Sequence, residues 1–115
     1  MNESEQLLAG EALSKARASS TPLDVATHRA APSSQADAYA IQAFVAAQLG
    51  AIGGWKIGAP SPEGQASFAP IARAGVCASG VSLRDGGTRM RGIEVELAYR
   101  LAIDLPHRTA PYEAQ

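Results

Sequence analysis

Two glutamates separated by one residue, Glu94 and Glu96, are the pair in this sequence best placed for chemistry. They lie where apolar and polar residues alternate, and on a β-strand such a pair shares one face with Cα atoms roughly 6.6 Å apart, twice the rise per residue. Two carboxylates so placed repel each other, and an oxygen-preferring cation such as Mg²⁺ or Mn²⁺ relieves that repulsion while binding both. The alternative interpretation is a solvated face of an edge strand, with Arg100 nearby to balance the charge.

Lys56 is the second candidate for a functional role. It lies between Trp55 and Ile57, and Gly54 and Gly58 on either side would let other groups approach closely. A lysine with apolar neighbours loses hydration, so its pKa falls and it can serve as a general base or as an anchor for an anion. The alternative is a lysine whose stem packs against the protein while its ammonium reaches solvent.

The cysteine and the histidines carry weaker signals. Cys77 lies in Gly-Val-Cys-Ala-Ser-Gly with no histidine nearby in sequence, and we expect it to be a small buried apolar residue. His28 and His107 lie at loop positions without the spacing of metal ligands, and we expect both to face solvent. The glycines from 50 to 58 precede a strand, and no Gly-Lys-Ser/Thr follows, which excludes a phosphate-binding loop.

The composition predicts a cytoplasmic protein that binds neither nucleic acid nor membranes. The formal net charge of −1 argues against a nucleic-acid partner, whose phosphates would select a basic face. A single cysteine cannot form an internal disulfide, which favours a reducing compartment. The polar, acidic start is unlike a signal or transit peptide, and the longest apolar stretch, residues 43–52, is too short to span a bilayer.

The first fifty residues predict two helices. The first runs from Asn2 to Ala18, with Asn2 and Glu5 as a variant of a capping box and with Gly10 weakening its interior. Ser33 or Ser34 can cap the second helix, which is expected to end at Gly50. Its expected apolar stripe consists of Ala36, Tyr39, Ala40, Ala43, Phe44 and Ala47.

The residues after Gly50 predict strands and turns. We expect a short extended piece at residues 53–58 and a loop over residues 59–70. Short strands are predicted at residues 81–83 and 88–90, around a turn at residues 84–87. The clearest strand covers residues 93–103, where every odd position is apolar. The predicted fold class is α+β, with two N-terminal helices followed by mostly antiparallel strands.

Five motifs in order carry a resemblance to a known family. They are Asp37-Ala-Tyr-Ala-Ile-Gln, Gly54-Trp-Lys-Ile-Gly, Ser67-Phe-Ala-Pro-Ile, Gly92-Ile-Glu-Val-Glu-Leu-Ala and Asp104-Leu-Pro. Together they resemble the N-terminal portion of the 2-keto-4-pentenoate hydratase family, which includes 2-oxo-acid decarboxylases. That family belongs to the fumarylacetoacetate hydrolase superfamily. The resemblance covers nearly the whole chain from about Leu7, but less than half of a typical family member.

The resemblance implies a fold and a set of site residues. Residues 1–50 would be an N-terminal helical segment, and residues 51–115 the first part of a catalytic mixed β-roll, truncated at the C-terminus. Glu94 and Glu96 would be two ligands of Mg²⁺ or Mn²⁺, and Lys56 would line the active site. The third acidic ligand of the family is expected beyond the end of this chain.

The resemblance also implies a reaction. The expected activity is that of a hydro-lyase, which adds water to a 2-hydroxy-2,4-dienoate in the catabolism of aromatic compounds, with a metal acting as a Lewis acid on the 2-oxo acid. The alternatives are a 2-oxo-acid decarboxylase, a C–C bond hydrolase of the same superfamily, or a truncated fragment that is inactive alone. For the hydrolase, neither His28 nor His107 is placed to assist a water molecule. Self-association into a homo-oligomer is a further expectation.

Overall fold

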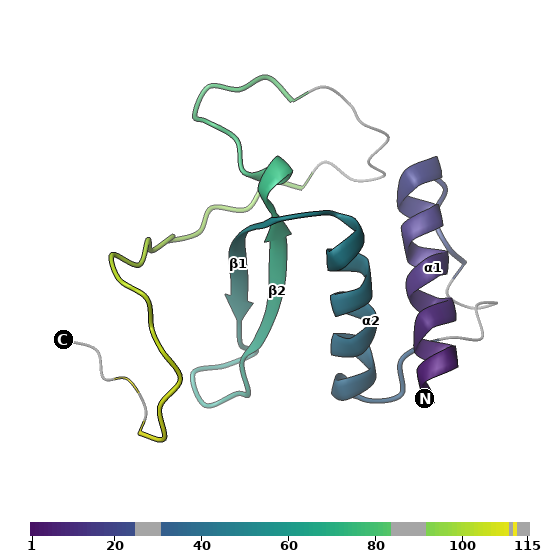
Figure 1. Cartoon of the computed structure of the whole chain (residues 1–115). Helices are drawn as coiled ribbons and strands as arrows, with labels where there is room; N and C mark the ends of the chain where they lie inside the picture. The colour runs from purple at the N-terminus through teal and green to yellow at the C-terminus, as the bar shows by residue number, and fades with distance from the viewer. Residues whose placement is uncertain (25–30, 84–91, 111, 113–115) are drawn as a thin grey trace.

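The structure is a computed structural model, which describes residues 1–24, 31–83, 92–110 and 112. Its elements are helix α1 (Glu3–Ser19), helix α2 (Gln35–Gln48), strands β1 (Ile52–Gly58) and β2 (Ser67–Ala72), and the short 3-10 helix η1 (Arg73–Gly75). They stand in layers, in the order α1, α2 and the β1–β2 hairpin, and the segment that begins at residue 92 passes behind the hairpin to its side away from the helices (Figure 1). The small α+β arrangement predicted from the sequence is therefore confirmed.

Helix α1 begins as its first residues predict. The side chain of Asn2 accepts a hydrogen bond from the backbone N–H of Glu5 at 2.9 Å, and the Glu5 carboxylate accepts one from the backbone N–H of Asn2 at 2.8 Å. This reciprocal pair satisfies backbone donors that the first turn of a helix leaves without intrahelical partners. The capping box is confirmed because it depends only on residues within one turn.

The two helices approach closely at Gly10. A Cβ atom built on Gly10 would lie 2.4 Å from Cδ1 of Phe44, so the absence of a side chain is what lets the Phe44 ring lie against α1. Gly10 weakens the helix locally and permits this packing in return. The apolar core that results is small, with Ala9 and Ile41 as the buried hydrophobic side chains of the described residues.

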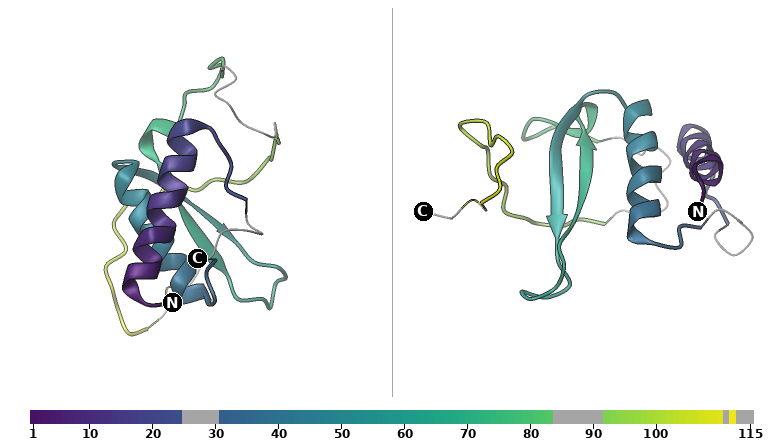
Figure 2. Two further views of the ribbon diagram at one scale, coloured as in Figure 1. Left: turned by 90° about the vertical axis from the view of Figure 1, so that its right-hand side faces the viewer. Right: turned by 60° about the horizontal axis from the view of Figure 1, so that its bottom comes forward.

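Helix α2 lies between two neighbours, α1 on one side and the hairpin on the other, as the right-hand view of Figure 2 shows. Ser34 caps its start by accepting a hydrogen bond from the backbone N–H of Asp37 at 3.1 Å. The expected single apolar stripe is wrong in part, because Ala43 and Ala47 are exposed while Asp37 and Ile41 are buried. A helix covered on two sides buries more than one stripe, and periodicity within the helix does not reveal the second neighbour.

Strands β1 and β2 pair in antiparallel orientation, with Lys56 opposite Ala69 and Ile57 opposite Phe68. The extended piece expected at residues 53–58 is confirmed as β1, but the loop expected to run to Pro70 is wrong over its last residues, which belong to β2. A two-stranded sheet consists only of edge strands, where a proline is tolerated. The ring of Tyr39 stacks on Phe68 with centroids 4.6 Å apart and so joins α2 to β2.

Two further strand predictions are wrong. Residues 81–83 and 93–103 form no strand, and the one predicted at residues 88–90 falls outside the described residues. A strand needs backbone partners, and within the described residues neither edge of the hairpin pairs with residues 93–103. The radius of gyration, 16.7 Å, accordingly exceeds the value of about 13 Å typical of a compact domain of this length.

Neither α1 nor α2, the α-helices of the described residues, combines the length and the apolar character needed to cross a lipid bilayer.

Candidate functional site

The structure brings Lys56, Glu94 and Glu96 together. The ammonium of Lys56 extends from β1 and donates hydrogen bonds to both carboxylates, to Oε2 of Glu94 and to Oε1 of Glu96, the latter at 2.5 Å. The lysine and the glutamates are 38 and 40 residues apart in sequence. The two glutamates therefore act on one side of their segment, as their spacing predicts, although that segment is not a strand.

The charges around Lys56 correct the expectation for its pKa. The hydrogen bond with Glu94, followed by the one with Glu96, raises the pKa of Lys56 above its ordinary value, so the predicted lowering is wrong. Trp55 and Ile57 are its neighbours in sequence, but the Lys56 side chain is only about half covered and faces two carboxylates. A lysine in this setting stays protonated at neutral pH and can anchor an anion, but it is poorly suited to act as a base.

The carboxylates of the pair are in turn affected by the lysine. The hydrogen bond and the charge of Lys56 lower the pKa of Glu94, which therefore stays ionised to lower pH than a free glutamate. The side chains of Glu94 and Glu96 are 71% and 52% exposed. Water and salt screen ion pairs as exposed as these, so the cluster contributes little to fold stability and remains open to exchange with other ions.

The donor set fits one part of a divalent-cation site. Two carboxylates already converge on one cationic group, the Lys56 ammonium, and Mg²⁺ commonly uses one or two carboxylates together with water and substrate oxygens. In the part of the chain that the structure describes, no group of three or more His, Cys, Asp or Glu side chains gathers that could hold a metal ion. Within that part, the candidate ligands are therefore the two predicted glutamates.

A cavity of about 360 Å³ lies between α2 and the hairpin, and Lys56 is among the residues that line it. Its lining is Gln35, Ala38, Tyr39, Gln42, Lys56, Gly58, Ser67, Phe68 and Ala69. The Tyr39 hydroxyl accepts a hydrogen bond from the backbone N–H of Phe68, and the Gln42 amide donates one to the backbone carbonyl of the same residue, both at 3.3 Å. These bonds fix two polar side chains at the wall of the cavity.

A larger cavity, of about 450 Å³, lies between the helices and β2. Apolar residues of both helices, of the segments next to them and of β2 make up most of its wall, and Lys56 is not part of it. Lys56 lines the smaller cavity, whereas Glu94 and Glu96 are not among the residues that line either cavity.

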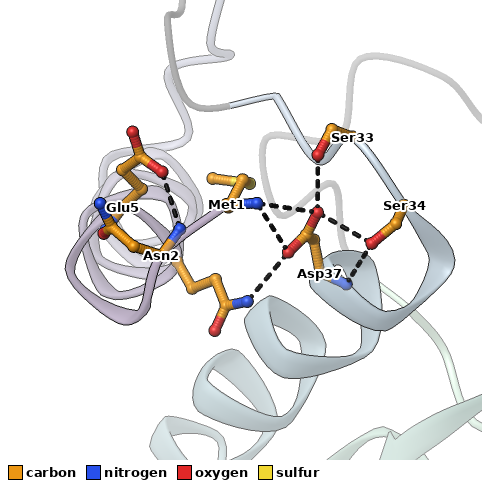
Figure 3. A network of polar contacts seen from close by, with 7 residues as sticks. Met1, Asn2, Glu5, Ser33, Ser34 and Asp37 are labelled. Carbon is orange, nitrogen blue, oxygen red and sulfur yellow. Dashed lines mark hydrogen bonds and ion pairs between the residues drawn. The ribbon is translucent and has the colours of Figure 1, made fainter.

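Asp37 is an important polar residue that the sequence did not single out as a candidate. Its side chain is buried, and its carboxylate accepts hydrogen bonds from the hydroxyls of Ser33 and Ser34 at 2.8 and 2.9 Å and from the Gln6 amide at 3.0 Å. The N-terminal ammonium of Met1 lies 3.2 Å from the same carboxylate, and Figure 3 shows how these groups surround Asp37. The network joins the start of α1 to the start of α2.

The hydrogen bonds to Asp37 occupy both of its carboxylate oxygens, so the residue is not available as an acid, a base or a metal ligand. The bond from Gln6, followed by those from Ser33 and Ser34, lowers the pKa of Asp37 far below its usual range, so it is a structural anion at neutral pH. The spacing Ser34-x-x-Asp37, a serine cap followed three residues later by an acid, is the signal in the sequence that indicates such a residue.

The remaining candidates have no visible role. Cys77 is exposed, which contradicts the buried position expected for it. It follows η1 in a stretch without helix or strand, where few neighbours cover the side chains. His107 is exposed, as predicted, and His28 lies outside the described residues.

No protein-family model, no curated protein and no solved structure matches this chain.

Proposed function

We propose that this chain carries part of the active site of a cytoplasmic, metal-dependent hydratase of the 2-keto-4-pentenoate hydratase type, which adds water to a 2-hydroxy-2,4-dienoate. The observation that carries the proposal is the contact of the Lys56 ammonium with the carboxylates of Glu94 and Glu96. The family resemblance assigns these three residues to one active site, and they come from segments distant in sequence.

Glu94 and Glu96 would hold Mg²⁺ or Mn²⁺ through their carboxylate oxygens. Bound there, such an ion supplies Lewis-acid polarisation of the 2-oxo-acid end of the substrate.

Lys56 binds the anionic end of the substrate in this proposal. Its raised pKa keeps the ammonium charged, so Nζ can donate hydrogen bonds to the substrate carboxylate and hold it in place. The group that removes a proton from the substrate is therefore another one, because a protonated lysine cannot accept that proton.

The cavity between α2 and the hairpin supports a small, partly apolar substrate. Its lining residues include Tyr39 and Phe68, whose rings would contact the hydrocarbon chain of a dienoate, and Lys56, which would hold its anionic end. About 360 Å³ lies within the range common for small-molecule sites.

The finer part of the fold belongs to the same proposal. The β1–β2 hairpin would be the first element of a mixed β-roll of the fumarylacetoacetate hydrolase type. The antiparallel pairing of its two strands supports this assignment.

Turnover of 2-hydroxypenta-2,4-dienoate in the presence of Mn²⁺, followed by the loss of its ultraviolet absorbance, tests the function. We expect Lys56→Ala and the double variant Glu94→Ala/Glu96→Ala to abolish turnover, while Glu11→Ala, at an exposed glutamate of α1, leaves it unchanged. Turnover that persists in the first two variants would refute the site. A chain without any turnover would instead be catalytically inactive by itself, which is the alternative outcome.

A further inference from the structure

The segment of residues 93–103 presents an unusual surface. Its six odd-numbered residues are large and apolar, and their side chains are between 65% and 96% exposed. They are Ile93, Val95, Leu97, Tyr99, Leu101 and Ile103. No described strand pairs with the backbone of this segment, which passes behind the hairpin and continues on its side away from α2 (Figure 1). Exposed alternating sequences of this kind are templates for pairing with another chain.

The polar face of the segment is complementary to itself. If two copies run antiparallel with Ala98 opposite Ala98, then Glu96 of each copy lies opposite Arg100 of the other, and Glu94 lies opposite Ala102. Two ion pairs therefore form across one two-fold axis. A parallel, in-register arrangement would instead place Glu96 opposite Glu96 and Arg100 opposite Arg100, which is repulsive.

The apolar face matches in the same register. Ile93 lies opposite Ile103, Val95 opposite Leu101, and Leu97 opposite Tyr99, so that each of the six apolar residues has an apolar partner. Cross-strand pairs of aliphatic and aromatic side chains stabilise antiparallel ribbons. The neighbouring register, with Leu97 on the axis, pairs Glu94 with Arg100 but leaves Ile103 opposite Arg91. Apolar matching therefore favours Ala98 on the axis.

We propose that this chain forms a two-fold dimer in which residues 93–103 pair antiparallel with the same segment of a second copy, with Ala98 on the axis, and that the bend at residues 102 and 103 straightens on pairing. The contact is isologous, so it closes with two chains. Glu94 faces Ala102 of the second copy in this register and keeps its hydrogen bond from Lys56, while the carboxylate of Glu96 is shared between Lys56 of its own chain and Arg100 of the second copy. The dimer is independent of the proposed enzymatic function, because it uses only the pattern and the exposure of this segment.

Sedimentation equilibrium of the full 115-residue chain, together with charge variants, tests the register. We expect the unaltered chain to dimerise at micromolar concentrations, and Glu96→Arg or Arg100→Glu alone to weaken the dimer at least about tenfold, because each places like charges opposite each other twice. An equimolar mixture of these two variants should dimerise again, because every cross-strand pair in the mixed dimer regains opposite charges. The double variant Glu96→Arg/Arg100→Glu should dimerise for the same reason.

Two further variants serve as controls. Glu94→Arg should keep the dimer, because it faces Ala102, while Leu97→Lys should dissociate it by placing an ammonium on the apolar face. Circular dichroism of α1 and α2 reports whether each variant stays folded, and these substitutions alter exposed side chains outside both helices.

Four results would overturn the proposal. They are a chain that stays monomeric, single charge variants that dimerise like the unaltered chain, assemblies that grow beyond two chains, and loss of the dimer in Glu94→Arg but not in Glu96→Arg. The last result would assign the axis to Leu97.

Discussion

The carboxylate of Asp37 and the carboxylates of Glu94 and Glu96 lie in opposite environments. Asp37, between the helices, is buried and receives hydrogen bonds from the serine hydroxyls and the Gln6 amide, with a terminal ammonium beside it. Glu94 and Glu96, beyond the hairpin, are largely exposed and share one lysine. A buried carboxylate whose two oxygens both accept hydrogen bonds stabilises the fold. Carboxylates held by a single solvated ammonium can exchange that partner for another cation, and this is the property a metal ligand needs.

Removing the buried carboxylate should have the largest effect on stability. Asp37→Ala would leave the donors of Ser33, Ser34 and Gln6 without their acceptor and detach the start of α1 from α2. We expect the largest fall in melting temperature of the substitutions discussed here, measured by circular dichroism. Glu94→Ala is the matched control, and an equal fall in that variant would contradict the distinction between the two environments.

Acid should act on the same carboxylate. Because the folded-state pKa of Asp37 lies below its unfolded value of about 3.9, its contribution to stability is fully present above that pH and is lost as the pH falls through the folded value. We expect the stability difference between the unaltered chain and Asp37→Asn to shrink as the pH is lowered below about 4. Chemical denaturation at a series of pH values measures the free energy of unfolding of both proteins. A difference that does not change with pH would contradict the stabilisation of ionised Asp37 in the folded state.

Filling the gap at Gly10 should have the next largest effect. In Gly10→Ala the new methyl group would meet the Phe44 ring at 2.4 Å, and overpacking of this kind costs about 1–3 kcal/mol. The better helix propensity of alanine offsets about 1 kcal/mol of that cost. We expect net destabilisation in urea unfolding, and recovery when Phe44→Leu is added. A stabilised Gly10→Ala variant would mean that the helices can separate at no cost.

Removing the lysine should change ion binding more than stability. The Lys56 ammonium repels a divalent cation from the carboxylates that it contacts, so Lys56→Met should bind Mn²⁺ about tenfold more tightly than the unaltered chain. Lys56→Arg keeps the charge and should bind as the unaltered chain does. Calorimetric titration measures both affinities. Weaker binding in Lys56→Met would instead make the lysine a scaffold that positions the carboxylates.

The smallest effect is expected in the titration of Glu94. Lys56 lowers the pKa of this carboxyl, so its contribution is present above the unfolded value of about 4.3 and is lost as the pH falls through the folded value. In Lys56→Met the pKa of Glu94 should return toward its ordinary value. Carboxyl carbon shifts in NMR spectra report the pKa. If the pKa of Glu94 is the same in Lys56→Met as in the unaltered chain, the result would contradict the contact between Lys56 and Glu94.

Local features were predictable from the sequence, and features that depend on distant partners were not. The caps at Asn2 and Ser34 need residues within one helical turn, so their pattern was sufficient. The alternation at residues 93–103 indicates a strand, but a strand forms only where another backbone supplies its hydrogen bonds. The convergence of Lys56 on the glutamates was expected from the family resemblance, whereas its raised pKa was not, because flanking residues reveal nothing about charges some forty positions away.

The stacking of Tyr39 on Phe68 has a practical consequence. Trp55, the single tryptophan of the sequence, lies edge-on to the same Phe68 ring, with centroids 5.7 Å apart, and is adjacent to Lys56. Its fluorescence therefore reports on the packing of the hairpin around Phe68, the residue that also contacts α2 through Tyr39, while the far-ultraviolet signal reports mainly on the two helices. The molecule thus carries an intrinsic optical probe beside its candidate site, and loss of packing in the hairpin can be followed separately from helix unfolding without any added dye.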